Sequence, residues 1–500
     1  MTKHHTPEEP VNEGTSTADR PTNALRAKPE SGAAAFTSAA ELGAAIAAGA
    51  LDPVAVCEDT LARIEQQNRN LHAFRQVDAG RALAAAQAAR ALLQSGRRLG
   101  PLHGVPYATK DLFDVAGLPT TAGSAALSNH MAQSDATVTR RLAQAGLVLV
   151  GKTHTVEFAF GSVGTNHHQG TPRNPWAHLH HVPGGSSSGS AVAVAGGLVP
   201  LATGTDTACS VRTPAALCGV VGLKTTVGRI SRAGVYPLSQ TLDSVGPIAR
   251  TVRDAALLFA ALQGPDPADP STLGVPPIDV LRTLDDGVAG LRIGMAEGLL
   301  FEDLDPEVEQ AVRNSAGVFR ALGASVEAAH FAEAAAVMTP PSIISLVEGY
   351  TVNQPLLDAH PELLDPFIRE RLRPGADVRA STYRAALNAL GPLRAAAARH
   401  FDRFDVLLAP TTMIPAAPLT SVNADFDTAM QYAHRYRRNC LVGNLLDLCA
   451  VSVPCGLTRA GLPIGLMIYA RGFREDLALR AAAAFEHATE WHGARPPHIY

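Results

Sequence analysis

The spacing of apolar and polar positions predicts helices at the start of the folded chain. Ser38 and Glu41 have the S-x-x-E spacing of a capping box, and the Ala- and Leu-rich run behind them ends near Gly49. Asp52-Pro53 is typical of an N-cap followed by the first residue of a second helix. A third helical run covers residues 81–94, so the pattern predicts a helical N-terminal portion.

Short apolar runs without alternation predict strands that are buried on both faces, as in α/β sheets. They occur at Leu147–Val150, Leu291–Met295, Val406–Leu408 and Ala450–Pro454. Helices are predicted over 306–322 and from Asp476, with a mostly helical segment up to about Phe404, whereas residues 264–287 read as an exposed connection. Interspersed strands and helices without an internal repeat favour one large α/β domain.

The N-terminal end of the chain has a different amino-acid composition. Residues 1–31 are polar and contain Pro10, Pro21 and Pro29 without an apolar core, so we expect a disordered tail over 1–33 and a folded domain over 34–500. At 46% hydrophobic and 18% charged residues, the 500-residue chain is apolar enough to form a sizeable core.

Charge and cysteine content narrow the class of partner. Lys+Arg total 42 and Asp+Glu 46, a net charge of −4 that gives no basic footprint for nucleic acid and no polybasic patch for a membrane. The longest apolar stretch, residues 191–202, is broken by glycines and a proline and is shorter than the roughly 20 residues of a membrane span. Six cysteines at this density suit a reducing compartment, so we expect a cytoplasmic protein.

Three motifs point to other chemistry and are rejected on context. Residues 146–153 match the phosphate-loop letters G-x-x-x-x-G-K-[ST], but their middle residues form a predicted strand instead of an open loop. Residues 185–189 match G-x-S-x-G without the preceding strand that a nucleophile elbow needs. No acid accompanies the histidines at 167, 168, 178, 180 and 181, so we expect no metal site and no cofactor.

A different set of residues carries plausible chemistry. Only five lysines occur in the chain, at 3, 28, 110, 152 and 224, and Lys110 lies where an apolar run ends. A serine hydroxyl is a poor nucleophile until a base takes its proton, and a lysine that burial keeps neutral can serve as that base through a second hydroxyl. If residues 104–111 form a strand, the Asp111 side chain points to the opposite face and does not hold the Lys110 ammonium.

These residues lie within three long motifs. Residues 104–111 read GVP-x-x-x-KD, residues 170–190 carry GTPRNPW and PGGSSSGS, and residues 204–219 read GTDT-x-x-S-x-R-x-PA-x-x-CG. In this order they resemble the amidase signature family, serine hydrolases of amides with a Ser–cis-Ser–Lys triad, over residues 36–497. The resemblance implies an α/β fold: a single large domain with a central mixed, twisted β-sheet covered by α-helices.

The resemblance also implies roles for individual residues. Ser210 resembles the nucleophile, Ser186 the serine that follows a cis peptide bond, and Lys110 the terminal base. The backbone N–H groups of Thr207, Ala208, Cys209 and Ser210 would form the oxyanion hole. The family has Gly-Gly where this chain has Ala208-Cys209, a departure that puts substrate size in doubt and, if the pair needs a positive φ, the shape of the loop.

Further residues are assigned supporting parts. We expect Asp206 and Arg212 to pair and brace the loop, with Ser187 as further structural support, and we interpret Lys152 and Lys224 as structural. Phe160, Gly161 and Ser162 are candidates for substrate binding, together with the region of about 340–405. Cys209, next to Ser210, is an alternative nucleophile whose side chain we expect to point away from the site.

The resulting hypothesis is an amidohydrolase that cleaves linear carboxylic amides through a Ser210 acyl-enzyme, with carbamates and esters as further substrates. We expect a small-molecule amide or carbamate as partner, no nucleic acid and no membrane, and leave a homodimer open. The alternative is the A (glutaminase) subunit of a tRNA-dependent amidotransferase. The sequence names neither the acyl nor the amine part of the substrate.

Overall fold

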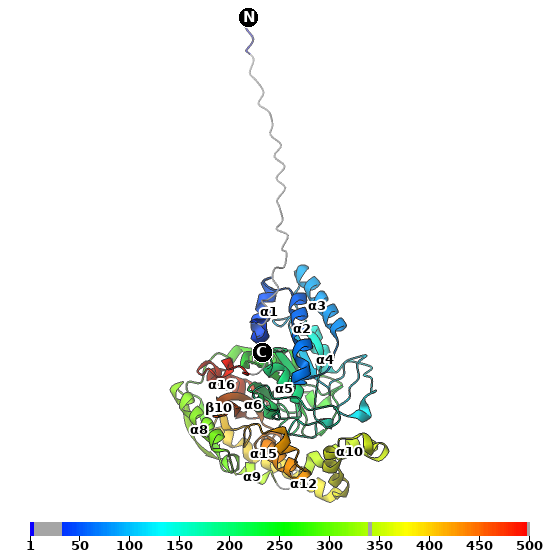
Figure 1. Ribbon diagram of the computed structural model, residues 1–500. Coiled ribbons are helices and arrows are strands. Elements are labelled where there is room, and N and C mark those ends of the chain that lie inside the picture. The colour runs from blue at the N-terminus through cyan, green and yellow to red at the C-terminus, as the bar shows by residue number, and fades with distance from the viewer. Residues whose placement is uncertain (5–32, 339–342, 498–500) are drawn as a thin grey trace.

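The computed structural model describes residues 1–4, 33–338 and 343–497, so the predicted tail over 1–33 lies almost wholly outside the described residues. The capping signals place the first helices as expected. Ser38 and Glu41 form a complete capping box at the start of one helix, and the Asp52 carboxylate accepts the Val54 amide at the start of the next. Figure 1 shows these helices, α1 and α2, at one end of the molecule beside α3.

The helices of the described residues are α1 Ala39–Ala47, α2 Pro53–Leu71, α3 Ala79–Gln94, α4 Thr137–Gln144, α5 Ser188–Ala195, α6 Arg212–Cys218, α7 Val252–Leu262, α8 Pro306–Ala321, α9 Glu333–Ala336, α10 Ile344–Ala359, α11 Pro366–Leu372, α12 Ala380–Ala398, α13 His400–Arg403, α14 Leu419–Val422, α15 Phe426–Leu445 and α16 Glu475–His487. The strands are β1 Phe74–Val77, β2 Pro106–Lys110, β3 Val148–Thr153, β4 Leu201–Asp206, β5 Val221–Lys224, β6 Ser244–Ala249, β7 Arg292–Glu297, β8 Ser325–His330, β9 Val406–Pro410, β10 Cys449–Leu457 and β11 Pro463–Ala470.

Within the described ranges the strands form one mixed 11-stranded sheet, in the order β1-β3-β2-β4-β6-β5-β10-β11-β9-β7-β8. Strand β2 runs parallel to β3 and β4, and β7 runs parallel to β8 and β9. The strands between these two groups pair antiparallel. The expected single large α/β domain with a mixed central sheet covered by helices is confirmed.

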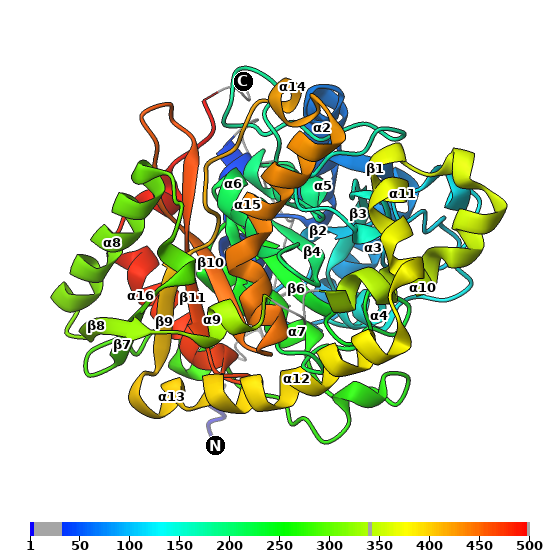
Figure 2. The ribbon, with the colours of Figure 1, turned by 90° about the horizontal axis from the view of Figure 1, so that it is seen from below.

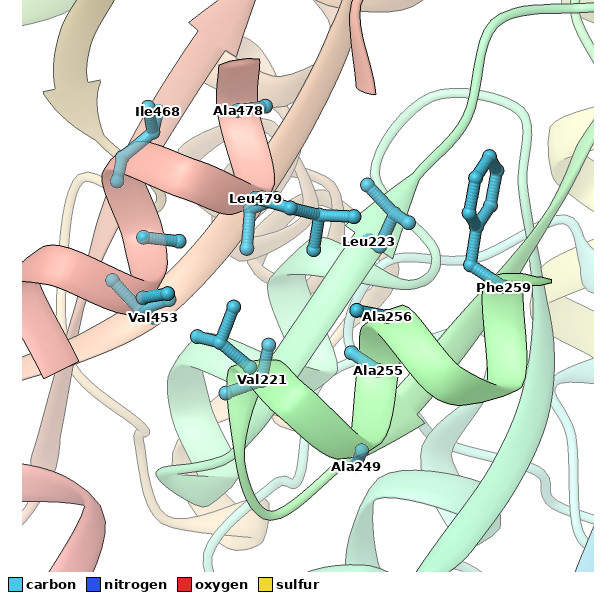
Figure 3. Close-up of a cluster of buried hydrophobic side chains, with 14 of the residues drawn as sticks. Val221, Leu223, Ala249, Ala255, Ala256, Phe259, Val453, Ile468, Ala478 and Leu479 are labelled. Carbon is cyan, nitrogen blue, oxygen red and sulfur yellow. The ribbon is translucent and has the colours of Figure 1, made fainter. Parts of the chain in front are cut away.

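Both faces of the sheet are buried, as the unbroken apolar runs predict. On β11, Leu466 and Ile468 join a core that includes α7 and α16, whereas Met467 and Tyr469 join another that includes α12 and α15. Figure 3 shows the first of these cores between α7, α16 and the strands, and Figure 2 shows α12 and α15 lying over the opposite face. Full burial of one such apolar side chain contributes about 1.5–3 kcal/mol.

The structure adds detail to two expectations about local structure. The segment up to Phe404 is mostly helical, as expected, but Ser325–His330 form β8, an edge strand that pairs only with β7 among the described strands. Residues 264–287 are not a simple exposed connection, because the buried Asp266 accepts hydrogen bonds from Thr137 and Ser231 at 2.6 and 2.5 Å.

The Gly- and Ser-rich segment of the sequence is packed at the centre of the domain. Helix α5, strand β4 and helix α6 are fully buried there. A Cβ at Gly204 would lie 2.8 Å from the Ser187 hydroxyl, and one at Gly185 would lie 2.8 Å from the Gly164 amide. Only glycine permits such close approach. No described helix is both long and apolar enough to cross a membrane.

Candidate active site

The predicted residues meet where the parallel strands β2 and β4 end. Lys110 is the last residue of β2, Thr205 lies near the end of β4, and Ser186 and Ser210 each lie two residues before a helix, α5 and α6 respectively. Open α/β sheets place their ligands outside the carboxyl ends of the strands, which is where Lys110 contacts Ser186 and Thr205.

The Lys110 side chain is 0% exposed and contacts hydroxyl groups. Its Nζ lies 2.8 Å from Ser186 Oγ and 2.8 Å from Thr205 Oγ1. Burial lowers the pKa of Lys110 to about 7, a shift that the negative charges of Asp243 and Asp206 oppose. Lysine at this position is therefore neutral in a large fraction of molecules at neutral pH.

The other two buried lysines have different surroundings. Lys152 pairs with Asp111 at 2.7 Å, so the Asp111 carboxylate is held away from Lys110, as we expect for a residue on the opposite face. Lys224 donates to the backbone carbonyls of Thr225 and Leu448, both at 2.9 Å. Both contacts are those of structural lysines.

The serine segment carries a cis peptide bond between Gly185 and Ser186. Its neighbour Ser187 donates a backbone hydrogen bond of 3.2 Å to the carbonyl of Ser210, which joins the Ser186 segment to the Ser210 loop. The Ser187 hydroxyl lies 3.4 Å from the Thr205 carbonyl. Ser187 therefore ties the two serine segments and β4 together, and it is not exposed as the nucleophile of a G-x-S-x-G elbow.

The loop over residues 207–210 presents unused donors. Within the part of the chain that the structure describes, the amides of Ala208, Cys209 and Ser210 donate to no other residue. The described residues with positive φ include neither Ala208 nor Cys209, so their side chains fit without left-handed backbone. The Thr207 hydroxyl donates to Asp243 at 2.5 Å.

Cys209 has the surroundings of an inert thiol. Its Sγ lies 3.6 Å from the Gly185 carbonyl, and burial raises the pKa of the thiol to about 12. Because the thiolate is the nucleophilic form, a thiol with this pKa is a poor nucleophile at neutral pH. Cys209 does line the same narrow cavity as Ser210.

A buried ion pair holds the start of helix α6. Arg212 binds Asp206 through two hydrogen bonds of 3.0 Å, and Asn444 contacts both partners. Burial by itself would raise the pKa of Asp206, but Arg212 and Asn444 lower it to about 2. The same carboxylate accepts the Val211 amide at 3.1 Å, so it fixes the backbone next to Ser210.

Arg212→Leu is expected to destabilise the fold by about 3–5 kcal/mol, because it leaves the Asp206 carboxylate buried without its partner. Urea unfolding of the two proteins measures the difference. Arg253→Ala, which removes an exposed pair with Asp285, serves as the control and should cost about 1 kcal/mol or less. Equal midpoints for Arg212→Leu and the wild type would contradict the bracing role.

The predicted substrate segment borders the serine. Phe160, Gly161 and Ser162 line a cavity of about 20 Å³ together with the 207–210 loop. The Ser162 hydroxyl is committed to the Ala433 carbonyl of α15 at 2.8 Å, so it holds that helix in place. A larger cavity of about 410 Å³ lies alongside and shares Ala159, Thr207 and Leu238 with the first.

The rejected motifs are structural here. Residues 148–153 of the phosphate-loop match belong to strand β3, so the middle of the match is strand as predicted. The histidines are dispersed in their contacts: His167 pairs with Asp365 at 2.8 Å, and His180 and His181 contact backbone carbonyls. Among the described residues no group of three or more His, Cys, Asp or Glu side chains is arranged to hold a metal ion.

Sequence reasoning missed several residues of the site. Thr205 and Asp243 surround the base and the loop, and Arg371 and Arg437 line the cavity at Ser210. Thr205 lies inside the GTDT motif, so the motif could have identified it as a site residue. Arg371 lies inside the region of about 340–405 that the sequence singled out for substrate binding, but no motif marks either arginine. Both follow Ser210 by more than 150 residues, and the fold brings them to the cavity.

Comparisons with known proteins agree on the family. The family model described as Amidase matches residues 55–479. The A subunit of the glutamyl-tRNA(Gln) amidotransferase of Chloroflexus aurantiacus is 38% identical over 478 residues, covering 91% of this chain and 96% of that protein. The 2-amino-5-chloromuconic acid deaminase of Comamonas testosteroni is 40% identical over 448 residues, covering 87% and 92%.

A comparison with a solved structure shows that the fold is shared as well. A bacterial aryl acylamidase of the amidase signature enzymes superposes with a TM-score of 0.82 at 29% identity, over 92% of this chain and 97% of that one. The family model, the relatives and the shared architecture lead to one conclusion: the chain belongs to the amidase signature family.

Proposed function

We propose that this protein hydrolyses linear carboxylic amides through an acyl-enzyme on Ser210, with Ser186 relaying the proton to neutral Lys110. Membership of the family makes it a hydrolase that acts on C–N bonds. The observation that carries the proposal is the position of Lys110, buried with its Nζ 2.8 Å from the Ser186 hydroxyl and with its pKa lowered to about 7 by burial.

Acylation begins when Ser210 Oγ attacks the carbonyl carbon of the amide. The Ser210 proton passes to Ser186 Oγ while the Ser186 proton passes to Lys110 Nζ, which becomes an ammonium. The negative charge that develops on the carbonyl oxygen is placed against the free amides of the 207–210 loop. Such preorganised donors typically lower the barrier by about 2.7–4 kcal/mol each.

The tetrahedral intermediate then collapses. The C–N bond breaks, and the amine nitrogen takes a proton from Ser186, which is resupplied by Lys110 as the lysine returns to its neutral form. Water then attacks the carbonyl carbon of the acyl-enzyme while its proton passes through Ser186 to Lys110. When the bond between the acyl carbon and Ser210 Oγ breaks, Lys110 returns that proton through Ser186 to Ser210 Oγ, which releases the carboxylic acid and leaves Lys110 neutral again. Carbamates and esters present the same acyl geometry and belong to the proposed substrate range.

A substrate screen tests the proposed reaction. We expect the purified chain to hydrolyse members of a panel of anilides, short aliphatic amides and carbamates without added cofactor, measured as amine release. Ser210→Ala protein in parallel gives the background. A panel in which wild type and Ser210→Ala release amine at equal rates would contradict the proposal.

The glutaminase component of an amidotransferase is the second candidate, favoured by the 38% identity to the A subunit of such an enzyme over 91% of the chain. A protein of this kind works in a complex, so gel filtration of the isolated chain combined with a glutamine assay separates the two. The free amidase predicts activity on panel amides by the isolated chain and poor use of glutamine. Glutamine as the preferred substrate would favour the amidotransferase component.

We also propose the cytoplasm as its location. The six cysteines are buried and free within the described structure, as thiols in a reducing compartment are.

A further inference from the structure

The larger of the two cavities described at the site, of about 410 Å³, begins at the proton relay. Its lining includes Thr205, whose hydroxyl lies 2.8 Å from Lys110 Nζ, and Leu112, which follows Lys110 by two residues. It shares Thr207 with the narrow cavity that Ser210 lines. The larger cavity therefore adjoins both the base and the loop that carries the nucleophile.

This position matches the place of the leaving group. In the proposed reaction the amine nitrogen takes its proton from Ser186, which is resupplied by Lys110, so the amine part of the amide lies on the Lys110 side of the scissile carbon. The carbonyl oxygen lies at the free amides of the 207–210 loop, which line the narrow cavity. The amine part then extends into the larger cavity, and the acyl part stays in the narrow one.

The two cavities differ greatly in size. The narrow cavity, of about 20 Å³, has room for little more than one water molecule, which needs about 10–15 Å³. The larger cavity, of about 410 Å³, falls in the range of about 300–1,000 Å³ that small-molecule sites occupy. A small acyl group therefore fits beside Ser210, whereas the amine part can be as large as a substituted ring.

The walls of the larger cavity are apolar in its middle part. Val235, Pro237 and Val245 line it there. Tyr236 adds an aromatic ring, and its hydroxyl is already committed to Asn353 at 2.9 Å. Aromatic rings pack favourably against one another in offset or edge-to-face arrangements. These walls suit an apolar ring better than a polar chain.

The charged side chains that line the cavity within the described structure already have partners. The Asp243 carboxylate at the inner end accepts the Thr207 hydroxyl at 2.5 Å and the Leu238 amide at 2.9 Å. Arg232 is paired with Asp269 at 3.4 Å. Since a charged ligand would have to compete with these pairs, the cavity favours an uncharged body.

We infer that the substrate is an N-substituted amide of a small acyl group, and that its amine part carries an uncharged aromatic ring bound in the larger cavity. This inference rests on the proposed function and narrows its substrate class. The products are then a short carboxylic acid and an aromatic amine. A glutaminase would release ammonia instead, which needs no cavity of this size.

Two isomeric amides test which side of the scissile bond takes the ring. Acetanilide carries the ring on the amine side, and phenylacetamide carries it on the acyl side. We expect kcat/KM for acetanilide to exceed that for phenylacetamide by at least about 10-fold, the discrimination that a hydrophobic pocket gives for a group it cannot place. N-Benzylacetamide should share this advantage, which separates the position of the ring from the reactivity of an anilide.

A filled cavity connects the preference to this place in the fold. Ala233→Phe adds a ring to the cavity wall, outside the proton relay and the 207–210 loop. It should lower kcat/KM for acetanilide by about 10-fold or more, mainly through KM, and leave acetamide nearly unchanged. Ala143→Phe, the same change at an exposed position of α4, is the matched control. Ala268→Trp, at an exposed residue of the cavity lining, provides a second variant if Ala233→Phe does not fold.

Fluorophosphonate labelling of Ser210, measured in parallel, separates the two ways of failing. Ser210 that is labelled while acetanilide is hydrolysed no faster than phenylacetamide would overturn the inference and leave the Ser210 nucleophile standing. Equal losses on acetanilide and acetamide in a folded Ala233→Phe protein would overturn it as well. Failure of Ser210 to be labelled at all would instead overturn the proposed function.

Discussion

Ser210→Ala is expected to reduce the rate of amide hydrolysis on the order of 10⁶-fold, because it removes the hydroxyl that we propose forms the acyl-enzyme bond. What remains is the contribution of the oxyanion donors and of substrate binding. The variant removes one hydroxyl from the loop before α6 and should fold normally. Amine release under saturating substrate, on protein with an unchanged melting temperature, measures the effect.

The control for this variant is Ser421→Ala, an exposed serine of helix α14 that should keep full activity. Turnover of Ser210→Ala close to the wild-type rate would mean that another group attacks the amide. Cys209 would be the first residue to test, although burial raises the pKa of its thiol to about 12. Loss of the residual rate in Ser210→Ala/Cys209→Ala would then identify it.

The second large effect is expected at Lys110. Lys110→Ala removes the terminus of the proton relay and should lower kcat/KM by about 10²- to 10⁴-fold, the range of a positioned general base. Lys110→Arg should be as poor, because a guanidinium keeps its proton and cannot accept another. Lys152→Arg, which keeps the charge opposite Asp111, is the control and should be far milder.

The pH profile of the wild type follows from the lowered pKa of Lys110. The base works in its neutral form, so kcat/KM should rise with pH through a single limb with a midpoint near the pKa of about 7, and level off above it. An unperturbed lysine, with a pKa near about 10.4, would place that limb more than three pH units higher. A Lys110→Arg enzyme that retains most of its activity and the same profile would show that lysine acts only as a charge.

The sequence is enough to predict the fold class and the helices whose ends are marked by strong local signals. The capping box at Ser38 and the N-cap at Asp52 place two helices, because capping depends on residues a few positions apart. The edge strand β8 was missed because both of its neighbours in sequence are helical and its exposed residues give no apolar run. Pairing with β7 makes it a strand, and that partner lies outside any local window.

The candidate site also contains some residues that the sequence reveals and others that it does not. Lys110, Ser186 and Ser210 lie in contiguous motifs, so their identity is visible in the sequence. Their mutual geometry depends on β2 and β4 lying side by side, which the sequence does not state. Arg371 and Arg437 reach the cavity from helices α11 and α15, and no local spacing connects them with Ser210.

The most direct test is the rate at which a fluorophosphonate labels Ser210 as a function of pH, with the adduct located by peptide mapping. In the wild type we predict a single adduct on Ser210, formed at a rate that rises with a midpoint near the Lys110 pKa of about 7. In Lys110→Arg the same adduct should form slowly at every pH. An adduct on another residue, or Ser210 labelled as fast in Lys110→Arg as in the wild type, would contradict a Ser210 nucleophile activated by neutral Lys110.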